Sequence, residues 1–168
     1  MSKLSLRAAL VVAAGILIGI GGCGEITSAP AADGLRLIKA PAGAQFWTSG
    51  TGSRQASAVI GAEGGTLVGP GGARITFPAG ALSSPTRITM APADGYLGVE
   101  LQPHGLVFPE GRQPVLSLPL AGASYGSSRL WIVYVDGGSI EEVLPTSTVS
   151  GGTLSATLPH FSGYIGAE

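Results

Sequence analysis

The spacing of turn residues from Ala58 to the end of the chain limits the fold more than any other feature. Short apolar runs alternate there with turns rich in glycine and proline, a pattern typical of the strands of an all-β sandwich. The 168 residues include 28 Gly and 12 Pro, which disfavours long helices. We therefore expect residues 58–168 to form an all-β domain, a two-layer antiparallel β-sandwich that is immunoglobulin-like in appearance.

Individual runs carry the alternation that a half-buried strand requires. Ile75 in "ARITF" and Ile88 in "TRITM" each stand between an arginine and a threonine, so each strand is expected to show one face to a core and one to water. The run "RLWIVYV" has no charge from Leu130 to Val135 and is predicted to be a central strand. Pro119 cannot donate to a ladder, so the end of its strand is predicted to lie at an edge or a bulge.

The first 22 residues are predicted to be an export signal. Lys3 and Arg7 precede the apolar run "AALVVAAGILIGIGG", which is too short for a comfortable membrane span. The run ends in "IGGC", which resembles the lipobox of bacterial lipoproteins. This resemblance implies that Cys23 is lipidated and becomes the new N-terminus, so that the membrane is a partner. The alternative is that Cys23 is a small apolar residue at the end of an uncleaved anchor.

Cys23 is the only cysteine, so neither a disulfide nor thiol catalysis is expected. Gly24 follows it at the position where an aspartate favours inner-membrane retention in well-studied lipoprotein sorting. In a cell with two membranes, the resemblance therefore implies a cell-envelope protein anchored to the outer membrane.

Residues 23–57, rich in Ala, Pro, Gly, Ser and Thr, are interpreted as the lipidated cysteine and a flexible tether. A random-coil tether of that length would hold the domain on the order of 30 Å from the lipid. Within it, "LRLI" and "QFW" are apolar enough to dock as short edge strands, with Phe46 and Trp47 packing on the domain.

The charge distribution argues against nucleic acid as a partner. Removal of residues 1–22 deletes Lys3 and Arg7 and moves the formal net charge from −1 to −3, because seven basic and ten acidic residues remain. The seven Lys and Arg are scattered singly, so they form no basic stripe for a polyphosphate chain.

Residues 60–92, "IGAEGGTLVGPGGARITFPAGALSSPTRITMAP", resemble the opening of a ZU-five domain. This β-sandwich module occurs in netrin receptors, ankyrins and tight-junction scaffold proteins, and also in bacterial surface proteins. The corner "FPAGAL" carries most of the specificity. The later segments "GLVFPEGRQPVLSLPL" and "LWIVYVDGGSIEEVLPTSTVSGGTLSATLPHFSGY" resemble the family's second sheet and closing hairpins. The resemblance thus covers about residues 58–167 and implies a binding or structural module.

The chain ends with His160, Phe161 and Ser162 before its last strand-like run. In some animal ZU-five proteins a His-Phe-Ser sequence cuts itself between Phe and Ser. The resemblance implies an alternative function, a self-processing domain in which the Ser162 hydroxyl attacks the Phe161 carbonyl in an N-to-O acyl shift. That chemistry needs His160 as a base within reach of the hydroxyl and a strained peptide bond.

The other interpretation of these residues is structural. Phe161 would point into the core, Ser162 would face out, and His160 would be a half-exposed turn residue. Tyr164 and Ile165 would complete the last strand. Strand alternation places His160 and Ser162 on one face in either interpretation.

Other constellations predict no enzyme, cofactor or metal site. His104 has no second ligand at HxH or HxxxH spacing. Glu141 and Glu142 are adjacent, so on a strand they point to opposite faces and cannot pair as glycosidase carboxylates. We therefore expect a lipid-anchored binding or structural module that engages an unidentified protein or glycan through an exposed sheet face or edge.

Overall fold

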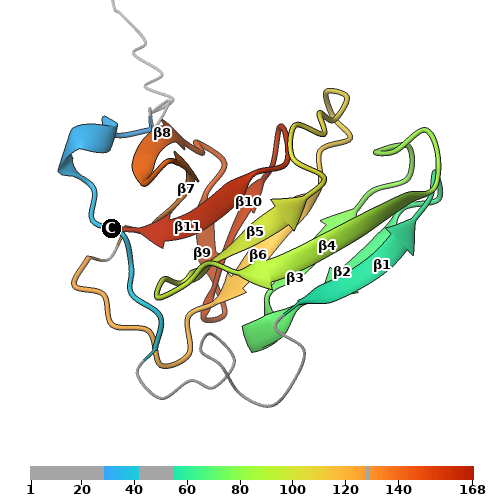
Figure 1. Cartoon of the computed structure of the whole chain (residues 1–168). Helices are drawn as coiled ribbons and strands as arrows, with labels where there is room; N and C mark the ends of the chain where they lie inside the picture. Colours follow the sequence, from blue (N-terminus) through green and yellow to red (C-terminus); the bar gives the residue numbers. More distant parts are fainter. Residues whose placement is uncertain (1–28, 42–54, 128) are drawn as a thin grey trace, which may run out of the picture.

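The computed structural model describes residues 29–41, 55–127 and 129–168. These residues form strands β1–β11, all in antiparallel pairs, and two 3₁₀ turns, η1 (Ala32–Gly34) and η2 (Pro70–Gly72) (Figure 1). The strands are β1 (Ala56–Ile60), β2 (Gly65–Val68), β3 (Arg74–Phe77), β4 (Thr86–Pro92), β5 (Gly98–Gln102), β6 (Val115–Pro119), β7 (Trp131–Asp136), β8 (Ser139–Val143), β9 (Thr148–Ser150), β10 (Thr153–Thr157) and β11 (Gly163–Ala167).

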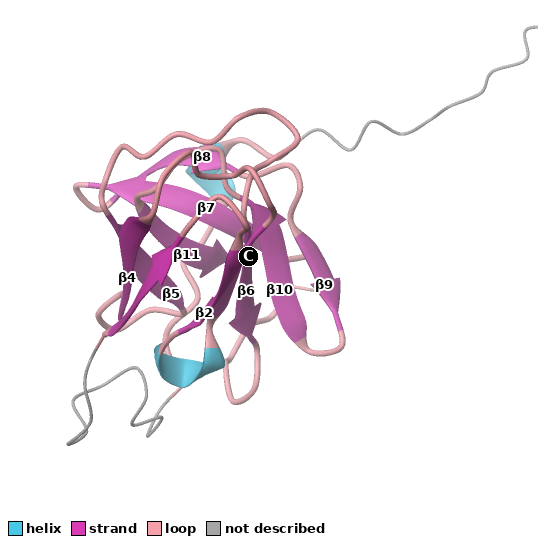
Figure 2. Cartoon of the chain, turned by 90° about the vertical axis from the view of Figure 1, so that its right-hand side faces the viewer, coloured by secondary structure: helices cyan, strands magenta, loops and turns pink. Residues whose placement is uncertain are grey.

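The strands form two sheets that face each other, as the rotated view shows (Figure 2). The six-stranded sheet has the order β1-β4-β5-β11-β7-β8, and the five-stranded sheet has the order β2-β3-β6-β10-β9. Each sheet mixes strands from distant parts of the sequence, so neither sheet can form from a local segment alone. The predicted all-β, two-layer antiparallel sandwich is confirmed.

The core lies between the sheets and is built from every second side chain. Ile75 and Ile88 are fully buried, as predicted, while their arginine neighbours are exposed. At one end of the core, Phe77, Phe108 and Phe161 make edge contacts with ring centroids 5.1–6.1 Å apart. Such edge-to-face pairs add to the free energy that burial of the rings already supplies.

Strand β7 confirms the prediction of a central strand. It lies between β11 and β8, and both of its faces are covered. Ile132 faces the main core, while Trp131 and Val133 join a second apolar cluster on the outer face of the six-stranded sheet. An uncharged run was needed here because neither face of the strand meets water.

Pro119 ends β6 where the strand has no partner on its β3 side, so the predicted edge is found locally, although β6 is the middle strand of its sheet and is paired without a bulge. The N–H of Leu120 donates to Gly152 on the β10 side, so the nitrogen of Pro119 faces the other way, toward β3. The β3 ladder has already ended at the Arg74–Ser117 pair. The missing donor of Pro119 therefore costs no ladder hydrogen bond.

The "FPAGAL" corner turns the chain after β3 through a close main-chain contact. Gly80 has a φ of 79° and donates its N–H to Ala62 at 2.7 Å. A Cβ atom on Gly64 would lie 2.3 Å from the Phe77 carbonyl oxygen. Glycine is required at both positions, because a side chain would be strained at the first and would clash with the backbone at the second.

Part of the segment predicted to be a tether belongs to the folded domain. The "LRLI" stretch docks, as expected, but between two segments rather than at an edge. Its Ile38 N–H donates to Gly166, and the Leu97 N–H donates to Ile38, so it bridges the end of β11 and the start of β5. Ile38 enters the main core, and Leu35 and Leu37 cover the second cluster.

In Figure 1 this blue segment runs beside the C-terminus. Strand β1 also begins at Ala56, two residues before the predicted start of the domain. The rest of the predicted tether, residues 23–28 and 42–54, lies outside the described residues, as do Cys23, Phe46 and Trp47.

Glu168 holds the N-terminal segment, residues 35–39, against the sheet. The Glu168 carboxylate pairs with Arg36 at 2.7 Å and accepts the N–H of Ser127 at 2.9 Å and that of Gly126. Arg36 and Glu168 also exchange two main-chain hydrogen bonds. The N–H groups of Ser127 and Gly126, together with the nearby Arg36 guanidinium, hold the pKa of the Glu168 carboxyl below its usual range.

Replacement of Ile38 by alanine should destabilise the domain, because the side chain is 2% exposed and would leave a cavity. We expect a loss of about 2–5 kcal/mol in the free energy of unfolding, measured by urea denaturation. Val59→Ala is the matched control, since Val59 is 57% exposed and should cost within about 0.5 kcal/mol. Equal losses in the two variants would show that the N-terminal segment is not part of the folded unit.

The Glu168 contacts should make stability depend on pH. A carboxyl whose folded pKa is depressed contributes stability that is fully present above the unfolded value, near 4.5, and is lost as the pH falls through the folded pKa. We expect Glu168→Gln to unfold more easily than the wild type at pH 7 and the two to converge below that range. A difference between them that is independent of pH would contradict this assignment.

Candidate functional site

The His-Phe-Ser sequence lies directly before β11, against residues 105–108. The N–H of Phe161 donates to Leu106 at 2.8 Å, and the carbonyl of Phe161 accepts the N–H of Gly105 at 3.0 Å. His160 forms an isolated antiparallel bridge with Val107. The peptide bond in question is thus held on both sides by sheet-like hydrogen bonds, and Phe161 is 1% exposed in the core, as the structural interpretation expected.

The His160 ring sits in a cluster of tyrosines and one acid. Its Nδ1 lies 3.3 Å from the Tyr164 hydroxyl, which donates to the His160 carbonyl at 2.7 Å. The ring packs edge-on against Tyr134, with centroids 4.9 Å apart, and Nε2 lies 3.8 Å from a Glu142 carboxylate oxygen. Both ring nitrogens therefore face groups other than Ser162.

Ser162 does not face outward, as the structural interpretation supposed, because it is only 9% exposed. Its carbonyl accepts the N–H of Leu101 at 3.1 Å. Ser162 is in a bend and β11 begins at Gly163, so the strict alternation assumed from sequence does not pass through it. Among the residues that the structure describes, no hydrogen bond joins His160 to the Ser162 hydroxyl. The geometry supplies a hydrogen-bonded carbonyl but not a base on the nucleophile, and self-cleavage stays the alternative hypothesis.

Two neighbouring groups titrate outside their ordinary ranges. Burial, with smaller contributions from Glu142 and Tyr134, raises the pKa of the Tyr164 hydroxyl well above its usual range. Burial also raises the pKa of the Glu100 carboxyl, and His104 opposes this shift while Asp136 reinforces it. Tyr164 therefore stays a neutral hydrogen-bond donor to His160 at any physiological pH.

Sequence reasoning missed this cluster. Tyr164 of β11 lies directly opposite Tyr134 of β7 in the strand register. Glu142, on β8, lies opposite Tyr134 on the other side of β7. Alternation along each strand was readable, but which strands pair was not. Glu142 does lie beside Tyr134 and His160, whereas His104 is near the Glu100 carboxylate, whose pKa its charge lowers.

No group of three or more His, Cys, Asp or Glu side chains suited to a metal ion occurs in the described part of the chain. Within those same ranges, no helix has the length and apolar character needed to cross a bilayer.

A second candidate site is the outer face of the five-stranded sheet. The inward residues of these strands, such as Leu116 and Leu154, are fully buried, so their neighbours point outward. Registered rows across the sheet place the outward residues side by side. These outward residues, of which two thirds bear a hydroxyl, are Thr66, Val68, Arg74, Thr76, Val115, Ser117, Pro119, Thr148, Ser150, Thr153, Ser155 and Thr157. We call them the hydroxyl face.

Neighbouring hydroxyls on this face bond to one another across strands. Ser117 and Ser155 are 2.9 Å apart, and Thr66 and Thr76 are 3.3 Å apart. Each hydroxyl can donate once and accept twice, so these pairs leave hydrogen-bonding capacity directed to solvent. Arg74 is the only charged member of the face.

The two outer faces of the sandwich differ in what covers them. Leu35 and Leu37, from the N-terminal segment, lie over Trp131, Val133 and Ile165 on the six-stranded sheet. No corresponding segment among the described residues packs on the hydroxyl face. In Figure 2, β6, β10 and β9 of the five-stranded sheet lie side by side.

Comparison of the chain with protein-family models found no match, and comparison with curated proteins found none either. The resemblance to ZU-five domains and to the lipobox therefore stays a prediction.

The His160 geometry predicts that the chain stays intact. Intact mass spectrometry of the purified protein should give a single mass in which the Phe161–Ser162 bond is uncleaved. The mass of the Ser162→Ala variant should differ from it only by the one oxygen atom that the substitution removes. Detection of a fragment ending at Phe161 in the wild type, and its absence in Ser162→Ala, would instead establish self-processing and make the close Gly105 N–H a transition-state donor.

Proposed function

We propose that the chain is a lipid-anchored lipoprotein of the cell envelope, attached through Cys23, whose β-sandwich is a binding module. The hydroxyl face is its contact surface. The observation that carries the proposal is the contrast between the two outer faces. One is covered over β7 and β11 by the protein's own N-terminal segment, while the other carries rows of cross-strand hydroxyl pairs without such a cover among the described residues.

The chemistry of the face favours an uncharged polyhydroxylated partner, namely a glycan. Protein partners are usually held by aromatic and arginine anchors at the centre of an interface. The hydroxyl face has no aromatic residue, and its one arginine, Arg74, is exposed near a strand end. Sugar hydroxyls donate and accept in the same way as Ser and Thr, so a glycan chain fits a surface with few charges and many two-way hydrogen-bonding groups.

The anchor part of the proposal has a direct test. Cells expressing the full chain should incorporate radiolabelled palmitate into it, and Cys23→Ser should abolish the label, because Cys23 is the only thiol. The variant should also leave the membrane fraction. Label that persists in Cys23→Ser would contradict lipidation at this residue.

The binding part is tested with insoluble neutral polysaccharides, a β-glucan and chitin, in co-sedimentation with the full chain in detergent. We expect Thr76→Glu to weaken binding at least tenfold, because it places a carboxylate among the uncharged hydroxyls of the face. Thr89→Glu is the matched control. Thr89 is also a strand threonine with a hydroxyl partner, Ser57 at 2.8 Å, but it lies on the other sheet. Equal binding by both variants, or none by the wild type, would contradict a glycan on this face.

A further inference from the structure

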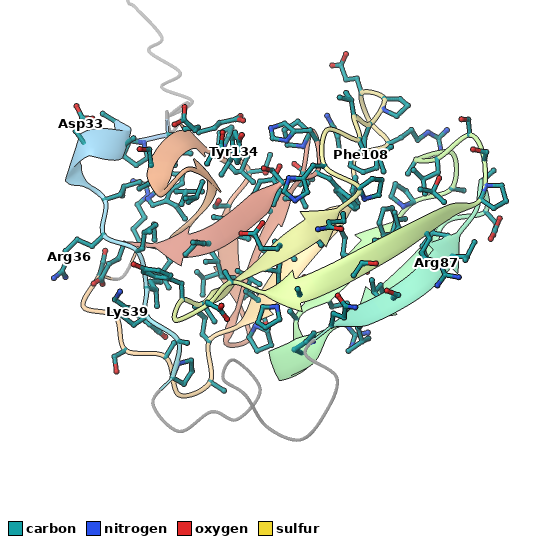
Figure 3. All side chains as sticks on the ribbon, in the orientation of Figure 1. Asp33, Arg36, Lys39, Arg87, Phe108 and Tyr134 are labelled. Carbon is teal, nitrogen blue, oxygen red and sulfur yellow. The ribbon has the colours of Figure 1, made fainter. Side chains whose placement is uncertain are left out.

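A small cavity lies at the end of the sandwich beyond the "FPAGAL" corner. It has a volume of about 240 Å³. One wall is formed by residues 80–84 and Thr86, and the other by Leu106, Val107 and Pro109. The buried Ala81 and Leu82 line it from the first wall, and the hydroxyls of Ser83, Ser84 and Thr86 add polar groups. The labelled Phe108 marks this end of the molecule in Figure 3.

Val107 gives this cavity a free strand edge. In its bridge with His160, the hydrogen bonds are made by the flanking residues, from Phe108 N–H to Pro159 and from Phe161 N–H to Leu106. The N–H and C=O of Val107 itself therefore point away from His160. No described residue bonds to either group, and the Val107 side chain is 71% exposed, the highest value among the large exposed apolar residues of the described chain.

A positive charge stands at the rim of the same cavity. Arg112 donates from Nη1 to the Ala79 carbonyl at 2.7 Å, and its guanidinium lies 3.9 Å from a Cβ atom built on Gly80. Arg112 makes no ion pair with any described acid, including Glu110 two residues before it. Its remaining N–H groups are available to a carboxylate.

We infer that this cavity is a docking site for an extended peptide segment of a partner protein. The segment pairs with the N–H and C=O of Val107 by strand addition, inserts an aliphatic side chain into the cavity and places a carboxylate on Arg112. Main-chain pairing contributes affinity for any extended peptide. The cavity and Arg112 favour peptides that carry an aliphatic side chain and a carboxylate. The site is separate from the hydroxyl face, so it does not depend on glycan binding.

The test measures binding of fluorescein-labelled five-residue peptides to the full chain in detergent by fluorescence anisotropy. The peptides carry Val, Leu or Gly at the centre and Asp or Lys at one end. We expect aliphatic centres to bind at least tenfold more tightly than Gly, and Asp-ended peptides more tightly than Lys-ended ones. Arg112→Gln should remove the preference for Asp.

The main-chain contact is tested from both sides. Val107→Pro removes the unused N–H and should weaken binding at least tenfold, while Val107→Thr keeps it and should bind nearly as the wild type. N-methylation of the central peptide residue removes the complementary donor and should also abolish binding, which keeps the test valid if Val107→Pro fails to fold.

Three outcomes would overturn the inference. They are no peptide binding below 1 mM (a free energy weaker than about −4.1 kcal/mol), undiminished binding of N-methylated peptides, and binding equal for Gly and aliphatic centres. Self-association of the chain that Val107→Pro abolishes, without peptide binding, would instead make a second copy the occupant.

Discussion

The burial of β11 is the constraint on which the rest of the structure depends. This strand lies between β5 and β7, and its five residues are buried. At its end it also accepts the N-terminal segment through Ile38 and Gly166. Every other feature is arranged around it: the tyrosine cluster at one end, the Glu168 contacts at the other and the second apolar cluster on its outer face. The last residues of the chain thus hold the six-stranded sheet together, and the sheet cannot be complete until they are in place.

Alternation of apolar and polar residues was enough to predict the fold class, because side-chain burial in a strand has a period of two and repeats in nearly every run. The uncharged stretch of β7 likewise predicted a strand covered on both faces. Pairing between distant strands was beyond the sequence, since it depends on contacts that no local pattern encodes. For that reason the opposition of Tyr134 and Tyr164 was missed, and the assumption that Ser162 continues a regular strand was wrong. Which side of β6 lacks a partner at Pro119 was unreadable for the same reason, because it depends on which neighbouring strand ends first.

The two outer faces of the sandwich differ in their cover because the outward side chains of the two sheets differ in polarity. Outward positions of β7 and β11 are apolar, Trp131, Val133 and Ile165, and they need a cover, which Leu35 and Leu37 provide. Outward positions of the five-stranded sheet are mostly Ser and Thr, which remain solvated without one. The sandwich thus has one outer face that is covered over β7 and β11 and another that is polar and uncovered by the described residues. The proposed glycan contact and the peptide site near Val107 use different parts of the open surface.

The docked N-terminal segment also limits how far Cys23 can lie from the folded domain. Five residues separate Cys23 from Ala29, the first residue that the structure describes. Fully stretched, that link spans at most about 22 Å, since each of the six steps from Cys23 to Ala29 adds no more than about 3.6 Å. With a lipid on Cys23, the sandwich would lie close to the bilayer, its η1 end nearest the headgroups. It would not move at the end of a long flexible tether. Such a molecule samples a thin shell above the membrane, and whatever it recognises must come within that shell.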